Sequence, residues 1–86
     1  MLKSWHETAW EDYLYWQSQD KRTLKKINAL IKDIERNGRV TTGLPEFLSG
    51  DLAGWCSVRI DAKNRLVFAV DDGVLEIYQC RGHYGR

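Results

Sequence analysis

Apolar residues recur at helical spacing in the first half of the chain. They follow one another at steps of three or four, at Leu24, Ile27, Leu30, Ile31 and Ile34. Such a stripe is typical of a helix that packs one face against a core. Asp20 supplies an N-cap ahead of the stripe, and Asn37-Gly38 supplies a stop after it. The pattern predicts a helix between these two signals.

An earlier helix is expected to begin at Thr8. Thr8 and Glu11 have the spacing of a capping box, with Thr8 at the N-cap. Trp10 and Tyr13 follow on one helical face. Core packing is the ordinary role of such rings, and we expect it for both of them and for Trp5. A link of only Gln19-Asp20 makes the two helices an antiparallel hairpin.

The second half alternates apolar and polar residues, which is typical of strands. Three stretches alternate in this way: residues 55–60, 65–70 and 75–80. A turn is expected at 61–64, and Asp72-Gly73 is a strong signal for a tight hairpin turn. Residues 2–5 are a candidate for a further, short strand.

Matching apolar residues across the expected hairpins sets their register. Val70 then pairs with Leu75 and Phe68 with Ile77, while Val58 pairs with Leu66 and Cys56 with Phe68. A slip of one residue would move a whole apolar set to the wrong face. The same register places Cys56 and Cys80 on opposite faces, which disfavours a disulfide between them.

This register also sets Arg59 directly across from Arg65. Like charges that face each other in a sheet cost about 0.2–1 kcal/mol. One explanation is that the two guanidinium groups hold a phosphate, whose geometry they match well. The other is that both side chains extend into water, or that Asp61 or Glu76 neutralises them. The pattern alone does not choose between these readings.

Composition indicates one small domain over residues 1–86. Hydrophobic residues make up 43% and charged residues 29% of the chain, a balance that argues against disorder. No apolar run reaches the roughly 18 residues of a spanning helix, and no secretory signal is apparent. With only two cysteines, a reducing cytoplasm is the expected location. We expect no membrane association.

The net charge of +1 hides an uneven distribution. Residues 1–20 sum to −3, residues 21–42 to +5 and residues 43–86 to −1. The basic residues of the second helix lie on the arc opposite its apolar stripe: Lys21, Arg22, Lys25, Lys26, Lys32 and Arg36. A basic block of this kind suggests an anionic partner, although a solvated helix face is the commoner explanation.

Few groups remain that could perform chemistry. The spacing of Cys56, Cys80, His6 and His83 fits no usual zinc motif, and no phosphate-binding glycine loop is present, so we expect neither metal nor cofactor. Glu46 precedes the strands, and His83 follows them. A base, an acid and cations suit metal-free transphosphorylation of RNA. Taken singly, an exposed loop carboxylate and a tail histidine are the more ordinary interpretations.

Segments along nearly the whole chain resemble the YoeB-type toxins of the RelE/ParE toxin–antitoxin superfamily. Their order and spacing together make the resemblance specific. The segments are 10–17, Asp20-Lys21-Arg22, Lys26-Ile27-Asn28, Ile31-Lys32-Asp33, 43–46, 52–55, Arg59-Ile60-Asp61, 64–67 and His83-Tyr84. The resemblance implies an α+β fold like that of microbial ribonucleases, with an N-terminal two-helix hairpin packed on a twisted, largely antiparallel sheet.

The resemblance also implies an activity. Such toxins are ribosome-dependent endonucleases that cleave messenger RNA in the ribosomal A site and so inhibit translation. By similarity, Glu46 is the general base, His83 the general acid, Arg65 the group that stabilises the transition state with help from Arg59, and Tyr84 a residue that positions substrate or stacks on a base. The products would be a 2′,3′-cyclic phosphate and a 5′-hydroxyl.

Partners follow from the same resemblance. A YefM-type antitoxin is expected to cover the site, and operator DNA is expected to be reached only through that antitoxin. The ribosome and its RNA are the expected anionic partner of the basic helix face. Homodimer formation is a further expectation that the sequence leaves open.

Three departures from the family pattern bear on rate and affinity. Ser49 stands where a basic residue is usual, and Val58 where a second arginine commonly precedes Arg59. Gly85-Arg86 extend the chain beyond its usual His-Tyr end. Two alternatives to the nuclease also stay open: a ParE-like inhibitor of DNA gyrase, and a weakened relative that only binds antitoxin or ribosome.

Overall fold

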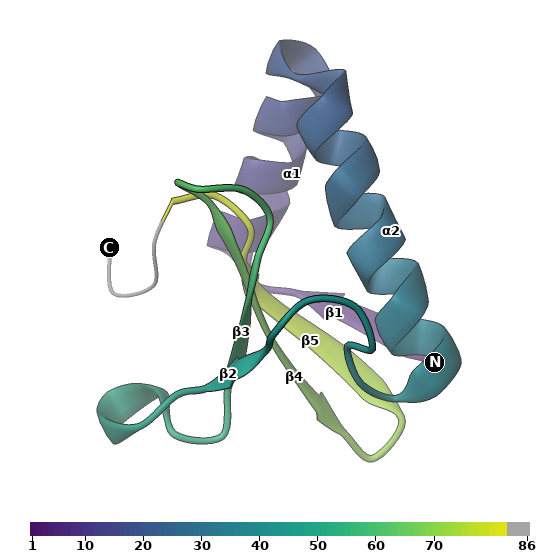
Figure 1. The fold of residues 1–86 in the computed structure, drawn as a ribbon, viewed down its shortest axis with the longest axis vertical. Coiled ribbons are helices and arrows are strands. Elements are labelled where there is room, and N and C mark those ends of the chain that lie inside the picture. Colours follow the sequence, from purple (N-terminus) through teal and green to yellow (C-terminus); the bar gives the residue numbers. More distant parts are fainter. Residues whose placement is uncertain (83–86) are drawn as a thin grey trace.

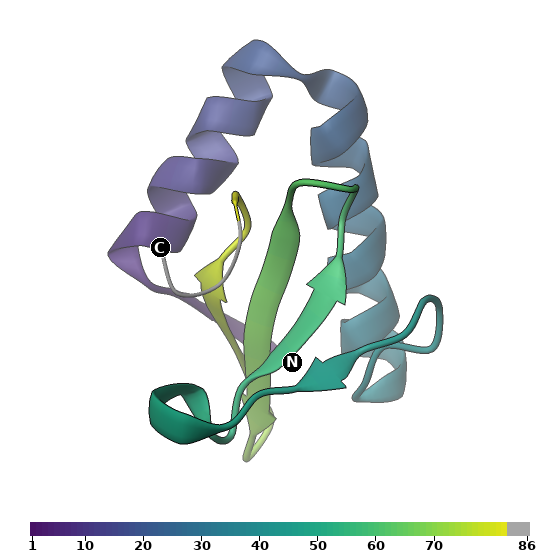
Figure 2. The same cartoon turned by 60° about the vertical axis from the view of Figure 1, so that its left-hand side comes forward.

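The computed structural model describes residues 1–82 as two helices packed on one five-stranded sheet. Figure 1 shows both helices on the same side of the sheet, and Figure 2 shows the other side of the sheet facing forward. The elements are β1 (Leu2–Trp5), α1 (Glu7–Gln19), α2 (Lys21–Asn37), β2 (Glu46–Phe47), the short 3-10 helix η1 (Gly50–Leu52), β3 (Cys56–Arg59), β4 (Arg65–Asp71) and β5 (Val74–Gln79).

The strands lie in the order β1-β5-β4-β3-β2. The β1–β5 pair is parallel, and the other three pairs are antiparallel. This arrangement confirms the expected α+β class, with a helix hairpin on a largely antiparallel sheet. It also places the strand that carries Glu46 at one edge of the sheet.

Helix α2 begins and ends at the predicted signals. The Asp20 carboxylate accepts hydrogen bonds from the backbone N–H groups of Arg22 and Thr23 and from the Thr23 hydroxyl. The Thr23 hydroxyl is the main cause of a lowered pKa for Asp20. At the other end, Gly38 adopts φ 73°, a left-handed conformation that a residue without Cβ adopts at no steric cost.

Helix α1 differs from its prediction in two ways. It begins at Glu7 with His6 at the N-cap, so the predicted cap at Thr8 is wrong. Trp10 is 44% exposed, so its predicted core position is also wrong. The buried side chains of this helix are Ala9, Asp12 and Trp16. Trp10 instead stacks on Tyr13 at the rim of the core, with ring centroids 5.8 Å apart.

The predicted hairpin registers are confirmed. Val70 pairs with Leu75, Phe68 with Ile77, Val58 with Leu66 and Cys56 with Phe68. The register of β4 on β5 then shifts by one residue, so that Gln79 rather than Tyr78 lies across from Val67. Because of this bulge, the residues after Tyr78 face the opposite side of the sheet from the one that simple alternation predicts.

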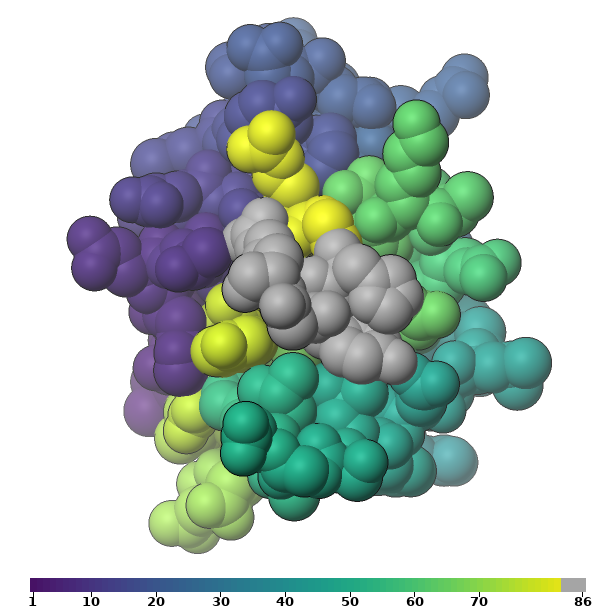
Figure 3. Space-filling view, turned by 90° about the vertical axis from the view of Figure 1, so that its left-hand side faces the viewer, coloured from purple at the N-terminus to yellow at the C-terminus, as the bar shows by residue number. Residues whose placement is uncertain are grey.

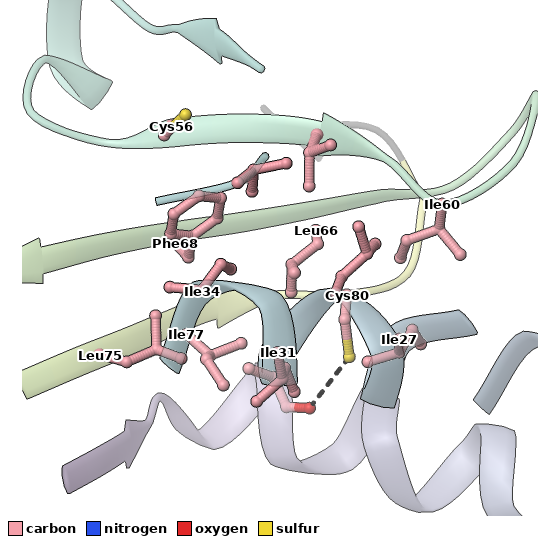
Figure 4. Packing of buried hydrophobic residues seen from close by; sticks show 14 of the residues in the cluster. Ile27, Ile31, Ile34, Cys56, Ile60, Leu66, Phe68, Leu75, Ile77 and Cys80 are labelled. Atoms are coloured by element: carbon pink, nitrogen blue, oxygen red, sulfur yellow. Dashed lines mark hydrogen bonds between the residues drawn. The ribbon is translucent and has the colours of Figure 1, made fainter. Parts of the chain in front are cut away.

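The bulge places Cys80 in the core together with Cys56, so the prediction that the two cysteines lie on opposite faces is wrong. Cys80 is fully buried in the same cluster as Cys56, and both are free thiols. Figure 4 shows the Cys80 Sγ among the isoleucines of α2, with its hydrogen bond to the carbonyl oxygen of Ala9 at 3.7 Å. The helix-side face of the sheet is thus the hydrophobic core. The opposite face, which we call the far face, carries the polar residues of β3 and β4.

Candidate active site

Ser57 lies at the centre of the far face, fully buried between Glu46 and Arg65. The antiparallel register pairs Ser57 with Glu46 on one side and with Val67 on the other. A guanidinium N–H of Arg65 (Nη1) donates a hydrogen bond to the Ser57 Oγ at 3.3 Å. Two strands therefore bring the carboxylate and the guanidinium to the same residue.

The predicted pairing of Arg59 with Arg65 is confirmed. Both line a cavity of about 490 Å³ whose other lining residues include Lys26, Gly43 and Leu44. Three cations from three different elements thus surround one opening on the surface, an arrangement suited to an anion.

Neither carboxylate that could have neutralised the arginines does so within residues 1–82. Asp61 accepts hydrogen bonds from the backbone N–H groups of Lys63 and Asn64 in its own turn, and Glu76 lies 3.5 Å from the His6 Nε2. Partial burial raises the pKa of Asp61, but the hydrogen bonds from Asn64 and Lys63 together lower it by more. The pKa of Asp61 therefore lies below its ordinary value.

The turn between β3 and β4 binds Gly82, the last described residue, beside Arg65. The Asn64 Oδ1 accepts a hydrogen bond of 2.7 Å from the backbone N–H of Gly82. The backbone N–H of Arg65 donates one of 2.9 Å to the Gly82 carbonyl. Gly82 immediately precedes His83 in the sequence.

Helix α1 holds the same segment from the opposite side. The Asp12 carboxylate accepts a hydrogen bond from the Cys80 N–H at 3.1 Å, and the Trp16 indole N–H donates one to the Cys80 carbonyl at 2.8 Å. The Arg81 guanidinium lies 3.5 Å from the centroid of the Tyr15 ring. We call residues 79–82 the anchored end. Figure 3 shows it in yellow between the purple first helix and the green β3–β4 turn.

Sequence reasoning missed the roles of Asp12 and Trp16 in this anchor. They lie four residues apart, one helical turn, and Ala9 lies three residues before Asp12. The sequence did contain a signal for this role, because Asp12 shares a helical stripe with Ala9 and Trp16. It indicates a buried acceptor for a backbone donor, because buried charges require partners.

The strand that carries Glu46 is short and exposed. It consists of Glu46 and Phe47 alone, and the Leu44 and Phe47 side chains are 90% and 86% exposed. One further backbone hydrogen bond, from the Leu48 N–H to the Trp55 carbonyl at 3.0 Å, continues the pairing with the chain before β3. We call residues 43–48 the carboxylate edge.

Asp33 of α2 holds the loop that leads to the carboxylate edge. Its carboxylate accepts hydrogen bonds from the backbone N–H groups of Thr41 and Thr42, from the Thr41 hydroxyl and from the Asn37 amide. These bonds, the Thr41 hydroxyl first, lower the pKa of Asp33 to about 2.

All six basic residues predicted to bind RNA or the ribosome are exposed on α2. Lys26 lines the cavity that contains Arg59 and Arg65, and it lines a second cavity, of about 470 Å³, together with Lys32 and Arg36. Neither cavity is lined by the remaining three residues: Lys21, Arg22 and Lys25. The basic face of α2 therefore continues into the candidate site at Lys26.

The other predicted positions are placed as follows. Val58 is buried in the core, as its inward parity indicates. Ser49 lines a cavity of about 260 Å³ together with Glu46. His83, Tyr84 and Gly85-Arg86 lie outside the described residues.

Among residues 1–82, no group of three or more His, Cys, Asp or Glu side chains could hold a metal ion. Neither helix in this part of the chain is long and apolar enough to cross a membrane.

Comparison with known proteins identifies the family of the chain. The family described as "YoeB-like toxin of bacterial type II toxin-antitoxin system" matches residues 5–84. The toxin YoeB of Escherichia coli K12 is 52% identical over 80 residues, which cover 93% of this chain and 95% of that protein. The chain belongs to the YoeB-like toxins of type II toxin–antitoxin systems.

Solved structures of YoeB toxins share this fold. A YoeB/ParE toxin from Agrobacterium tumefaciens matches with a TM-score of 0.90 and 43% identity, covering 98% of this chain and all of that one. The YoeB of Staphylococcus aureus, solved in a heterotetrameric complex with YefM, matches with a TM-score of 0.89 and 44% identity, covering 98% of this chain and 99% of that one. A YoeB of S. aureus was also solved as a dimer.

Proposed function

We propose that this YoeB-like toxin is an endoribonuclease that cleaves messenger RNA in the ribosomal A site and thereby inhibits translation. One observation supports the proposal above the others. Glu46 and Arg65 flank Ser57 on the far face, and the residue directly before His83 is hydrogen-bonded to the Arg65 backbone. A base, a cation and the segment leading to an acid thus approach one place.

The proposed reaction needs no metal. Glu46 removes the proton from a ribose 2′-hydroxyl, and the 2′-oxygen attacks the adjacent phosphorus. Arg65 and Arg59 stabilise the negative charge that develops on the phosphoryl oxygens. His83 donates its proton to the departing 5′-oxygen, and Tyr84 positions the substrate. The bond to that oxygen breaks, giving a 2′,3′-cyclic phosphate and a 5′-hydroxyl.

The ribosome is the proposed anionic partner of the basic face of α2. Its phosphates would contact the exposed lysines and arginines, and Lys26 would connect that contact to the cavity beside Arg59. Such contacts predict strongly salt-dependent association with ribosomes.

The proposed protein partner is a YefM-type antitoxin, because the similar S. aureus toxin was solved in complex with YefM. Operator DNA would be contacted only through that antitoxin. A homodimer is proposed on the basis of the S. aureus dimer, and the cytoplasm is the proposed location.

Replacement of the proposed base tests the function. Purified toxin is incubated with ribosomes programmed with a defined message, and 5′ ends and terminal groups are mapped. We expect wild-type toxin to cut within the A-site codon and Glu46→Gln to cut about 10²–10⁴-fold more slowly. Glu11→Gln, which alters an exposed carboxylate on α1, is the matched control and should retain full activity.

The outcomes separate the alternatives. Unchanged cleavage by Glu46→Gln would refute the role of that carboxylate. Absence of cleavage by the wild-type toxin, together with impaired DNA supercoiling, would instead support a ParE-like gyrase inhibitor.

A further inference from the structure

Three rings form a cluster on the far face of the sheet, beside the candidate active site. His6 follows β1, Trp55 precedes β3 and Tyr78 lies near the end of β5. The ring centroids of His6 lie 5.4 Å from those of both Trp55 and Tyr78, and the Trp55 and Tyr78 centroids are 5.2 Å apart. We call these three residues the aromatic platform.

The platform exists because of two features of the neighbouring strands. The bulge makes Tyr78 the extra residue of β5, on the side of the sheet away from Ile77. The register of β3 on β4, continued by one residue, brings Trp55 alongside Ala69. The Ala69 side chain is a single methyl group, which adds little bulk to the face of β4 beside Trp55.

The platform lies at the surface and not in the core. Trp55 and Tyr78 are half-buried, His6 is exposed, and none of the three belongs to the buried hydrophobic cluster. The Glu76 carboxylate lies 3.5 Å from the His6 Nε2, so a hydrogen-bonding edge borders the rings. Aromatic surface with a polar border suits a flat ligand that also has polar edges.

Alternation along one segment aligns the platform with the site. Arg59, Ser57 and Trp55 are two residues apart, and successive alternate residues of a strand share a face at intervals of about 7 Å. Three features of the far face therefore lie in a row: Arg59 at the cavity that it shares with Arg65, then Ser57, then Trp55 of the platform. This order matches a ribonucleotide chain, whose phosphate and base need a cation and a stacking surface respectively.

We propose that the aromatic platform binds a nucleobase next to the scissile phosphate of the RNA substrate. The proposal rests on the proposed ribonuclease function. The base stacks on the exposed ring surface, and Glu76 and His6 contact its polar edge. Stacking accepts any base, whereas the polar border favours some bases over others, so the platform contributes to which messages are cut.

The test combines a change in the protein with a change in the RNA. Cleavage is measured on programmed ribosomes with a normal message and with messages that lack the base on either side of the cut. We expect Tyr78→Ala to cleave the normal message about tenfold more slowly, as loss of one stacked base implies. We also expect the base deletion on one side to slow the wild type similarly but to have little effect on Tyr78→Ala.

Matched variants separate stacking from folding. Tyr78→Phe keeps the ring and should cleave at close to the wild-type rate, while Trp10→Ala removes an exposed ring on α1 and should do the same. Thermal unfolding is measured for every variant. His6→Ala, a change at an exposed side chain, is the second platform variant should Tyr78→Ala fail to fold.

A binding measurement keeps the inference testable if the proposed function fails. Fluorescence anisotropy with 2′-O-methyl RNA, which cannot be cleaved, gives the same comparison of intact and base-deleted strands. Equal effects of base deletion in the wild type and in the platform variants would overturn the platform. A wild-type toxin that binds base-dependently but cuts nothing would support the platform and refute the nuclease.

Discussion

The anchored end and the carboxylate edge supply opposite sides of the candidate site, and they are supported very differently. In the anchored end, buried side chains of α1 form hydrogen bonds with the N–H and the carbonyl of Cys80. The N–H and the carbonyl of Gly82 form hydrogen bonds with Asn64 and Arg65, at the β3–β4 turn. The carboxylate edge contains a strand of only two residues, Glu46 and Phe47, and its Leu44 and Phe47 side chains are exposed.

This difference shows which half of the site the fold prepares in advance. Buried hydrogen bonds that are mutually satisfied hold a segment rigidly, because breaking one leaves a buried group without a partner. An exposed edge strand with few contacts opens at low cost in free energy. We therefore expect the approach to His83 to be set by the fold, and the position of Glu46 to adjust when RNA and the ribosome bind.

The largest effect is expected from Trp16→Phe, which removes the indole N–H that binds the Cys80 carbonyl. A buried carbonyl left without its donor should lower the free energy of unfolding by about 1–3 kcal/mol. For a domain of this size, each kcal/mol lowers Tm by roughly 4–8 °C, which calorimetry resolves. Trp10→Phe, at a ring that is 44% exposed, should change stability by under about 0.5 kcal/mol. Equal effects of the two changes would show that the anchored end is not specially supported.

A smaller loss of stability is expected from Asn64→Ala, which removes the acceptor for the Gly82 N–H. One hydrogen bond contributes about 1 kcal/mol. The cleavage rate should also fall, by about tenfold, because Gly82 precedes the proposed acid His83. A displacement of that acid that raises the barrier by about 1.36 kcal/mol slows the reaction tenfold. Rates come from the programmed-ribosome assay and stabilities from urea unfolding. Lys63→Ala, an exposed change in the same turn, is the control; a cleavage rate unchanged by Asn64→Ala would remove this turn from the positioning of His83.

The smallest effect is expected from Asp33→Asn, which should lower stability above about pH 4 by an amount that shrinks as the pH falls toward 2. The pKa of Asp33 is about 2 in the folded protein, against an ordinary value of 3.8. The unfolded chain thus binds more protons in this interval, and stability falls as the pH drops from about 4 through 2. Without the carboxylate, the urea-unfolding midpoint should depend less steeply on pH in that window. Identical pH profiles for the two proteins would show that Asp33 does not hold the loop before the carboxylate edge.

Local sequence signals predicted the structure correctly where a single residue type satisfies a local backbone requirement, such as a helix cap. Helix α2 starts after Asp20 and stops before Gly38 as predicted, because a cap depends on residues adjacent in sequence. The pairing of Arg59 with Arg65 was also predictable, since apolar matching of β3 and β4 leaves a single register. The location of Cys80 was not, because the bulge that inverts the end of β5 has no signal in the alternation of that strand.

The buried face of α1 shows the same limit. Its tryptophans at positions 10 and 16 are equally apolar, yet only Trp16 reaches the core. Which of them is buried depends on where the end of β5 offers a carbonyl to the indole N–H, a fact about two segments far apart in sequence.

The chain by itself determined the limits of α2, the apolar register of its two hairpins and its membership of the YoeB-like toxins, because these depend on periodicity, caps and turns within short stretches. Only the tertiary structure decided that Ser57 joins Glu46 to Arg65, that α1 and the β3–β4 turn hold the residues before His83, and that three rings meet beside them. Those arrangements depend on packing and hydrogen bonds between distant segments, and no local pattern specifies such contacts.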